Sequence, residues 1–361
     1  MAAPDYNVPA NVAEVLQNTA KKYRQELLTM PVKALTPLLQ HFQLRPGIRV
    51  SETVGELLAD AEYGPYDEKY KSEAGIEVAP RVLEVFFGNV EFDFSPNSVY
   101  STVWGSNITM GEALKNVPIA LQVLSYVALK LGGNLGKHLF DAVRDASKHK
   151  SKDLFNGFDT IAAAEVAGGG LSAANGNYME IPAITENNAL EVIQSICESA
   201  DELLMDLDLK LYVPRSVGWK FNKSCLLTLG AVPYNKEYKK TFVPGFENVE
   251  IVPLGCKAGS QYIQLSPRSN MLIGVNQVPG SKETVEVNRF SSFTLTYAAT
   301  TFFGTQYESI NKEKLMVAKV ASQSESDGGE SNGGGGNGGE SNGGGGNGGE
   351  SNGGGGNGGE G

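Results

Sequence analysis

Apolar and polar residues alternate most regularly between Leu83 and Phe94. Every second position is apolar in two short runs, as in strands with one buried face; these positions are Leu83, Val85 and Phe87, then Val90, Phe92 and Phe94. The pair Gly88-Asn89 separates the runs, and Gly followed by Asn favours a two-residue turn. We therefore predict an extended β-hairpin here, with a third strand after it at 99–104.

Helical periodicity replaces this alternation elsewhere in the chain. Spacings of three and four predict helices at 11–30, 118–150 and 188–204, and a shorter helix is expected at 216–229. Pro118 suits the first turn of the longest helix. Gly132 and Gly133 each weaken its middle by about 1 kcal/mol relative to Ala, so we expect a bend or a close helix contact there. Asn188, with Glu191 three residues later, is a candidate N-cap.

The other apolar runs predict strands, mostly in the last third of the chain. They lie at 209–213, 249–254, 262–266, 271–275, 283–287 and 293–303. The segment 48–75 is polar and has little periodicity, so we expect an extended arm that packs on something outside its own body. Helices and strands intermix along the sequence, and the predicted class is α+β with non-local strand pairing.

The last forty residues contain the unit ESNGGGGNGG three times, at 330–339, 340–349 and 350–359. This composition has nothing apolar to bury and predicts a disordered, flexible tail, so the folded part ends near Ala321. Six of the net −11 charges lie in the tail, which leaves about −5 for the rest. A mildly acidic body has no broad positive field to attract phosphates, and general nucleic-acid binding is disfavoured.

Cysteine usage and the apolar segments indicate a soluble, unexported protein. Cys197, Cys225 and Cys256 are far apart and form neither a CxxC pair nor a disulfide framework, which favours a reducing compartment. The first residues lack the basic start and apolar run of a signal peptide. The most apolar stretch, 117–131, is interrupted by polar residues and is too short to cross a bilayer.

Two glycine-rich motifs resemble nucleotide loops only loosely. The segment 168–173 fits a GxGxxA pattern, but no strand precedes it and no helix follows it, so we predict an ordinary loop. The segment 133–138 has a Gly-Lys pair, but Leu131 stands where a phosphate loop needs its first Gly and His138 replaces the hydroxyl that binds magnesium. Lys137 is expected to be helical and partly exposed.

No constellation of residues indicates catalysis, a metal or a cofactor. His41, His138 and His149 are the only histidines, and none has metal-ligand spacing to a Cys or another His. Cys197 and Cys225 are expected to pack in the core rather than act as nucleophiles, while the role of Cys256 stays open. We predict a protein that is not an enzyme and has no cofactor.

One basic concentration is present, formed by Arg144, Lys148, His149, Lys150 and Lys152. At the end of the long helix such charges are favourable next to the negative pole of the helix dipole. The alternative is a contact with another subunit or with nucleic acid.

The order of these segments resembles that of one known family. An N-terminal arm precedes a projecting hairpin (RVLEVFFGNVEFDFSP), a long helix, a helix–strand–helix unit (NNALEVIQSICESADELLMDLDLKLYVP, then VGWKFN) and late strands (MLIGV, ETVEV, FFGTQYE). This order resembles the fold of the major capsid protein of a tailed bacteriophage, which encapsulin shells and herpesvirus capsids share. The resemblance covers about residues 1–321 and rests on segment order, because the family has no short signature.

The resemblance implies a division into domains. These would be the N-terminal arm (1–74), the extended β-hairpin loop (75–115), the peripheral domain with its spine helix (116–185), the axial domain (186–285), the return strands of the peripheral domain (286–321) and the tail (322–361). An exposed hairpin and arm are aggregation liabilities in a monomer, whereas neighbours in a shell would cover them.

The resemblance also implies a function and partners. Copies of the chain would self-assemble into hexamers and pentamers of an icosahedral capsid around double-stranded DNA, held by weak non-specific contacts. Scaffold, portal and decoration proteins are further possible partners. The location would be the virion, with assembly in the host cytoplasm. Candidate inter-subunit contacts are Arg81, Phe86, Phe87, Phe92, Phe94, Trp104, Arg144 and Lys148.

Two alternatives remain open at this stage. An encapsulin-like compartment would use the same fold around a protein cargo. A surface-display or binding protein with a flexible tail would stay a small oligomer and keep 75–115 folded onto its own body.

Overall fold

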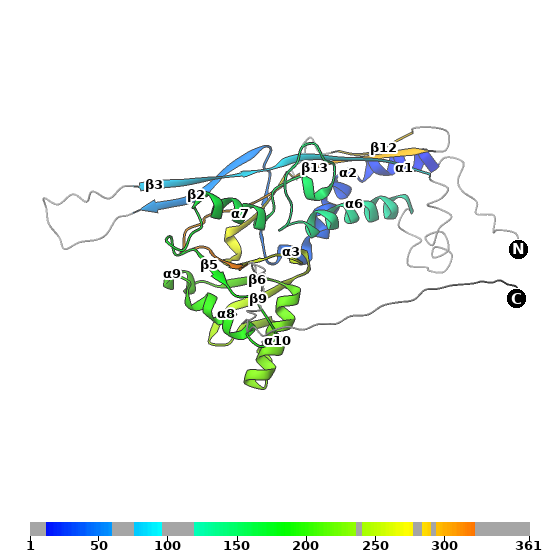
Figure 1. The fold of residues 1–361 in the computed structure, drawn as a ribbon. Helices are drawn as coiled ribbons and strands as arrows, with labels where there is room; N and C mark the ends of the chain where they lie inside the picture. Colours follow the sequence, from blue (N-terminus) through cyan, green and yellow to red (C-terminus); the bar gives the residue numbers. More distant parts are fainter. Residues whose placement is uncertain are drawn as a thin grey trace, which may run out of the picture. The chain divides into compact units, whose positions relative to one another are not determined.

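The computed structural model describes residues 12–59, 76–95, 119–235, 240–276, 284–289 and 294–321. The chain divides into two units, Met1–Ser322 and Gln323–Gly361. The second unit contains the Gly-rich repeats and lies outside the described residues. The architecture below is therefore that of the first unit (Figure 1).

A five-stranded sheet is built around one long strand, β13 (Leu295–Tyr307). One edge of β13 pairs antiparallel with β4 (Phe86–Phe94) over the whole length of β4. Its other edge pairs antiparallel with β12 (Val285–Arg289) and β11 (Met271–Val275), and β1 (Gln43–Pro46) runs parallel to β11. Strands far apart in the sequence therefore meet here, as the predicted α+β class requires.

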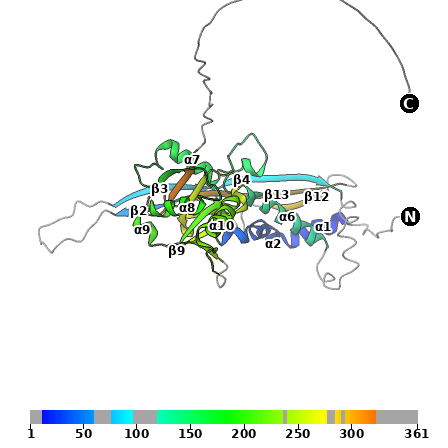
Figure 2. The same cartoon turned by 60° about the horizontal axis from the view of Figure 1, so that its bottom comes forward.

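Three helices pack together beside this sheet: α1 (Val12–Lys22), α2 (Arg24–Ala34) and α6 (Ile119–Lys137) (Figures 1 and 2). Their buried leucines share a core with β12 and β13. A Cβ atom on Gly132 of α6 would lie 2.1 Å from the carbonyl oxygen of Pro31 in α2. The predicted close helix contact at Gly132 is confirmed, because only glycine allows this approach.

A second sheet has seven strands in the order β5, β14, β10, β6, β9, β8, β7. Their bounds are Tyr178–Ile181, Met316–Val320, Tyr262–Pro267, Leu209–Pro214, Phe246–Leu254, Lys240–Val243 and Tyr234–Asn235, in that order. The central strands β10 and β6 are almost entirely buried, and β9 is buried from Val249 to Val252, so helices or loops cover both faces of the sheet there.

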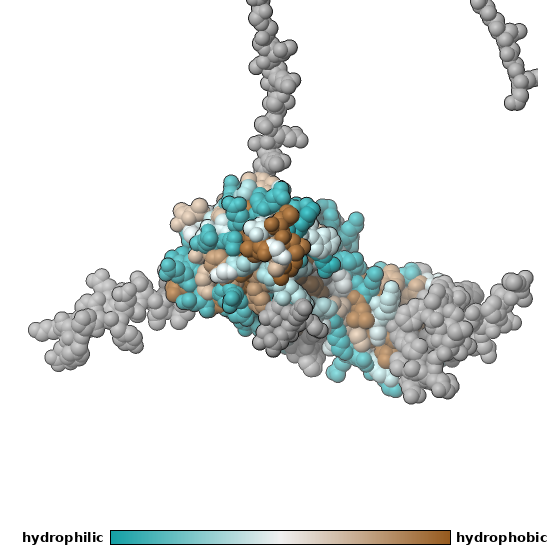
Figure 3. Space-filling view, turned by 90° about the horizontal axis from the view of Figure 1, so that it is seen from below, coloured by the Kyte–Doolittle hydropathy of each residue, from teal (hydrophilic) through white to brown (hydrophobic). Residues whose placement is uncertain are grey.

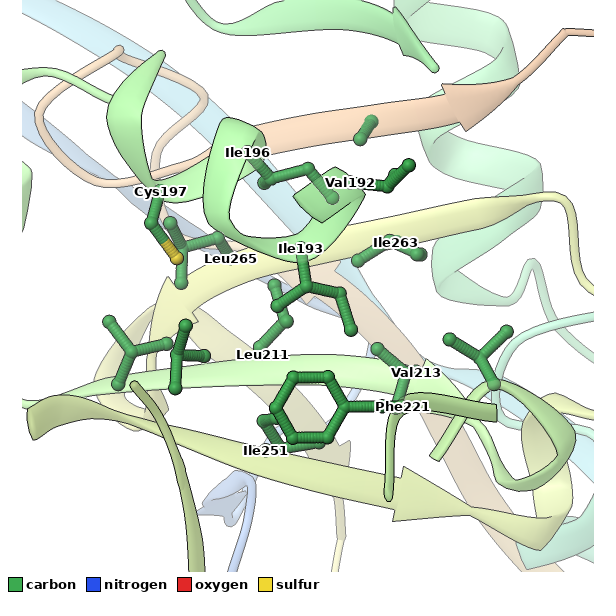
Figure 4. Packing of buried hydrophobic residues seen from close by; sticks show 14 of the residues in the cluster. Val192, Ile193, Ile196, Cys197, Leu211, Val213, Phe221, Ile251, Ile263 and Leu265 are labelled. Carbon is green, nitrogen blue, oxygen red and sulfur yellow. The ribbon is translucent and has the colours of Figure 1, made fainter. Parts of the chain in front are cut away.

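Two helices cover one face of the seven-stranded sheet, α8 (Ala189–Glu198) and α10 (Arg215–Leu229). Ile193 of α8 and Phe221 of α10 point toward Leu211, Ile251 and Leu265 of the strands (Figure 4). The alternating residues of β6 face the opposite side, where α3 (Thr36–Leu39) and α7 (Phe158–Gly168) border the second core. The short helix α9 (Glu202–Met205) follows α8.

An aromatic cluster joins the two sheets. The ring of Phe42 stacks on Phe158 at 5.6 Å and on Tyr212 of β6 at 5.4 Å, and Phe158 contacts Tyr307 of β13 at 5.3 Å. The Tyr307 hydroxyl donates a hydrogen bond to the Phe158 carbonyl at 3.0 Å. These pairs hold β6 and β13 against the same loop and helix.

A buried ion pair lies next to this cluster. The fully buried Lys257 donates from Nζ to Asp159 Oδ1 at 2.7 Å, and Gln264 Nε2 donates to the same oxygen at 2.7 Å. The Lys257 ammonium also lies 4.1 Å from the ring centre of Phe140. Burial lowers the pKa of Lys257, and the Asp159 carboxylate opposes that shift.

All six strands predicted from residue 209 onward are confirmed. β6, β9, β10, β11, β12 and β13 lie where the apolar runs were found, and α10 begins one residue before the predicted helix. Gly168–Gly170 form the end of α7 and a loop rather than a nucleotide site, with Gly169 in the left-handed region at φ 78°. The helix α7 itself was not predicted.

The predicted turn at Gly88-Asn89 is wrong. Both residues lie inside the continuous strand β4, opposite Thr301 and Thr300 of β13. Gly88 serves packing instead, because a Cβ atom there would lie 2.8 Å from Leu154 Cδ1. The hairpin-like element is one segment earlier, where β2 (Ser51–Ala59) pairs antiparallel with β3 (Ile76–Glu84).

The long helix ends earlier than predicted, at Lys137 rather than near Lys150. After the helix, the backbone forms hydrogen bonds with a later segment instead of helical ones. Val143 N–H donates to the Lys152 carbonyl, and Asp145 N–H donates to the Asp153 carbonyl, both at 2.9 Å. Leu139, Phe140 and Ala142 are fully buried by this change of direction. Burial of these three side chains in the core, rather than the helical pattern of the sequence, determines where α6 ends.

The other two predicted long helices are each divided. The N-terminal one breaks at Tyr23 into α1 and α2, and the one after Asn188 breaks into α8 and α9. Asp201 begins α9 by accepting a hydrogen bond from the Leu203 N–H at 3.0 Å. Asn188 holds the predicted cap position, but its Oδ1 accepts from Thr185 N–H at 2.7 Å rather than from the helix.

The two sheets do not follow the predicted contiguous domain ranges. β11 lies within 186–285 but joins the five-stranded sheet, whereas β5 and β14 lie outside that range and join the seven-stranded sheet. Non-local pairing makes the chain pass between the sheets several times.

Candidate subunit-contact surfaces

The described side chains of the β2–β3 ribbon anchor its base to the rest of the subunit. Val54 and Leu83 are buried there with Ile48, Leu272 and Phe302. Beyond this base, β2 and β3 run together away from α7 (Figure 1). A two-stranded ribbon has little stability by itself in water, which makes this ribbon a candidate contact surface.

Arg81 fixes the base of the ribbon to its own subunit. Its Nη2 donates to Glu165 Oε1 of α7 at 2.6 Å and to Gln306 Oε1 of β13 at 3.1 Å, and its side chain is 13% exposed. Gln306 Nε2 also donates to the carbonyl of Val82 at 3.1 Å. The predicted contact residue Arg81 therefore forms its hydrogen bonds and its ion pair within its own subunit.

Two of the predicted contact residues, Phe86 and Arg144, meet each other. The Arg144 guanidinium carbon lies 3.8 Å from the ring centre of Phe86. Arg144 N–H donates to Asn156 Oδ1 at 2.9 Å, and its Nη1 donates to the Leu154 carbonyl at 3.3 Å. This arrangement orders the loop after α6 against β4.

Phe87, Phe92 and Phe94 line β4 with different degrees of exposure. Phe87 is 53% exposed and contacts Phe302 with ring centres 4.7 Å apart. Phe92 is 37% exposed and lies 5.2 Å from Tyr297, while Phe94 packs partly buried on the core under α1. Phe87 and Phe92 lie on opposite faces of the strand, so β4 presents an apolar side chain on each.

β4 is also an edge strand. Among the described residues, β13 is its only strand partner, and its second edge carries backbone groups without a ladder. A long edge with exposed apolar side chains is a template for pairing with another chain.

Lys148 lies in the exposed loop after α6 and forms an ion pair with Asp145 at 2.8 Å. The hydrogen bond from Lys148, followed by that from Ser147, lowers the pKa of the Asp145 carboxyl. The loop is not a helix end, so the helix-dipole explanation of this basic cluster does not hold. The predicted contact Trp104 lies outside the described residues.

A cavity of about 350 Å³ opens between this loop, α2, α6 and β4. The residues that line it include the apolar Leu27, Leu131 and Val90 and the basic Arg144 and Lys148. The Tyr297 hydroxyl is buried without a hydrogen-bond partner in the described part of the chain.

The three cysteine thiols, all among the described residues, have raised pKa values. Burial raises the pKa of the Cys197 thiol to about 12 and those of Cys225 and Cys256 to about 11, so these thiols stay protonated at neutral pH. In the described ranges, no three His, Cys, Asp or Glu side chains gather as metal ligands. No helix within those ranges is long and apolar enough to cross a membrane.

The sequence matches no protein-family model and no curated protein. Solved structures are similar, however. A chain of the satellite phage P4 procapsid structure, which includes the size determination (Sid) protein, has a TM-score of 0.54 at 11% identity, over 87% of this chain and 92% of that chain. The chain has the fold of a phage capsid protein.

Two further structures are similar at lower scores. The capsid of Myoviridae phage XM1 has a TM-score of 0.48 at 13% identity, over 80% of this chain and 92% of that chain. The holo-SrpI encapsulin complex from Synechococcus elongatus PCC 7942 has a TM-score of 0.45 at 10% identity, over 78% and 86%.

Proposed function

We propose that this chain is the structural subunit of a tailed-phage capsid, and that its copies assemble as hexamers and pentamers into an icosahedral shell around double-stranded DNA. The capsid fold supports this function. The observation that carries it is the two-stranded β2–β3 ribbon, whose described side chains pack against their own subunit at its base. In a shell, a neighbouring subunit would cover the ribbon and bury its edges.

We assign to the ribbon the role that we predicted for the hairpin in 75–115. In this proposal β2 and β3 act as the extended loop, α6 is the spine helix, and the seven-stranded sheet with α8 and α10 forms most of the axial domain. β4, with Phe87 and Phe92 exposed on its two faces, is the second contact surface. The role is structural rather than catalytic.

The partners and location follow from this role. Other copies of the chain are the main partner, and scaffold, portal and decoration proteins would join during assembly in the host cytoplasm. Lys148 and its basic neighbours are candidates for a weak contact with DNA or with a neighbouring subunit. The virion is the proposed location.

Light scattering and negative-stain electron microscopy of the purified full-length chain test the proposal. We expect closed particles, or rings that close when a scaffold protein is supplied. A chain that stays monomeric with and without scaffold, and whose β2–β3 ribbon resists protease, would contradict it. Particles that enclose protein and exclude DNA would favour an encapsulin-like compartment.

A further inference from the structure

The outer face of α10 is unusually apolar. Its large side chains are exposed to 69% at Trp219, 52% at Leu226, 64% at Leu227 and 53% at Leu229, and Tyr234 just beyond the helix is 49% exposed. We call these five residues the α10 patch. α10 lies at the bottom of Figure 1, and an apolar patch is visible on that side in Figure 3.

The core does not explain these side chains. The inner face of α10 is satisfied by Val217, Phe221 and Cys225, which are buried against the seven-stranded sheet. A helix on the surface of a sheet normally has polar residues on its outer face. An exposed apolar cluster of this kind marks an interaction site.

The charge distribution identifies the occupant as another copy of the same patch. No charged residue occurs from Ser224 to Tyr234, so identical patches can meet without like-charge repulsion. Lys223 lies on the same exposed arc, between Trp219 and Leu227, and its charge is already paired with Glu186 of its own subunit. The nearby outer face of α8 and α9, by contrast, exposes Glu191, Glu198 and Glu202, which would repel their own copies.

The size and layout of the patch favour a ring over a pair. At half to two-thirds exposure the five side chains offer on the order of 600 Å² of surface, less than the roughly 800 Å² per partner of a standard stable interface. At 100° per residue, Leu227 and Leu229 lie on opposite flanks of the exposed arc, with Trp219 and Leu226 between them. Each copy can therefore contact two neighbours.

We propose, building on the shell-forming function above, that the α10 patches of neighbouring subunits meet one another around the rotation axis of each hexamer and pentamer. The patch then closes the centre of the ring with an apolar plug. Other contacts, including the ribbon, hold the subunits together at larger radius.

A matched pair of substitutions tests this arrangement. Leu227→Glu places five or six carboxylates around one axis, and we expect the yield of closed particles to fall at least tenfold. Leu203→Glu on α9 is the control, because Leu203 is a leucine of similar exposure (58%) in the same region, and its yield should stay within twofold of the unmodified chain. Circular dichroism confirms that both variants fold, and 1 M salt should partly restore assembly of Leu227→Glu because it shortens the Debye length to about 3 Å.

Proximity is measured directly with a fluorescent label. Leu227→Cys in a Cys256→Ser background, labelled with pyrene, should gain excimer emission when particles form. Normal particles from Leu227→Glu, equal losses in both Glu variants, or particles with monomer emission only would overturn the α10 contact while leaving the shell function intact. Failure of the unmodified chain to form rings or particles would instead overturn the shell function and this contact with it.

Discussion

Two adjacent glycines of α6 differ in what surrounds them. A Cβ atom on Gly132 would lie 2.1 Å from the Pro31 carbonyl oxygen and 2.5 Å from its Cα, whereas a Cβ atom on Gly133 would meet nothing within 4 Å. A backbone atom cannot turn away as a flexible side chain can. The contact between α2 and α6 therefore depends on one of the two glycines only.

Gly132→Ala is expected to lower the free energy of unfolding by about 3 kcal/mol, at the upper end of overpacking effects, because α6 must move away from α2. Gly133→Ala is the control and should raise it by about 1 kcal/mol, the difference in helix propensity. Urea unfolding followed by circular dichroism measures both. Equal effects of the two substitutions would show that α6 does not rest on Pro31.

At the scale of elements, the ion pair and hydrogen bonds of Arg81 stabilise the attachment of the ribbon to α7 and β13. Its ion pair with Glu165 is mostly buried, with side-chain exposures of 13% and 26%, whereas the ion pair of Arg45 with Glu308 has exposures of 39% and 34%. Buried charged hydrogen bonds contribute about 1.5–3 kcal/mol, and exposed pairs about 0–1 kcal/mol.

Arg81→Met should therefore accelerate amide hydrogen exchange at the base of the ribbon, in Thr53–Val54 and Val82–Leu83, by at least tenfold. The matched variant Arg45→Met should change exchange at the same amides by less than threefold. Exchange is read by mass spectrometry on the unassembled subunit. Unchanged protection in Arg81→Met would mean that the apolar base alone holds the ribbon.

Elements with strong local patterns could be predicted from the sequence, and those decided by distant partners could not. The runs that became β6, β9 and β11 are apolar enough to be recognised alone, and Gly132 indicated a close helix contact. Gly88-Asn89 was misread because its pairing with Thr300 and Thr301 and its packing on Leu154 come from distant parts of the chain. The polar strand β2 was missed because it alternates weakly and pairs mainly with β3.

The candidate contact surfaces could be placed only in part from the sequence, for the same reason. Sequence alternation identified Phe87 and Phe92, which the fold leaves exposed on an edge strand, but it could not place Arg81 against Glu165 from another element. The α10 patch was overlooked because its leucines resemble core residues in sequence. The uncharged run from Ser224 to Tyr234 was the available signal.

At the scale of the whole molecule, assembly and folding should be separable along β4. Phe87 is 53% exposed and contacts its own subunit mainly through Phe302, whereas Phe94 packs partly buried into the core under α1. Phe87→Ser loses one aromatic pair, about 0.5–1.5 kcal/mol, but removes a large apolar group from the proposed contact surface. Phe94→Ser instead removes core packing, at about 3 kcal/mol.

We therefore expect Phe87→Ser to lower the yield of closed particles at least tenfold while its Tm stays within a few degrees of the unmodified chain. Phe94→Ser should show the opposite order, with a lower Tm and, at temperatures where it stays folded, a smaller loss of particles. Differential scanning calorimetry and light scattering on the same samples separate the two effects. If Phe87→Ser assembles normally, that face of β4 is not a subunit contact, and the shell must be held by the ribbon and by other surfaces. If both variants show a lower Tm and a proportionally lower particle yield, β4 affects assembly only through the stability of the subunit.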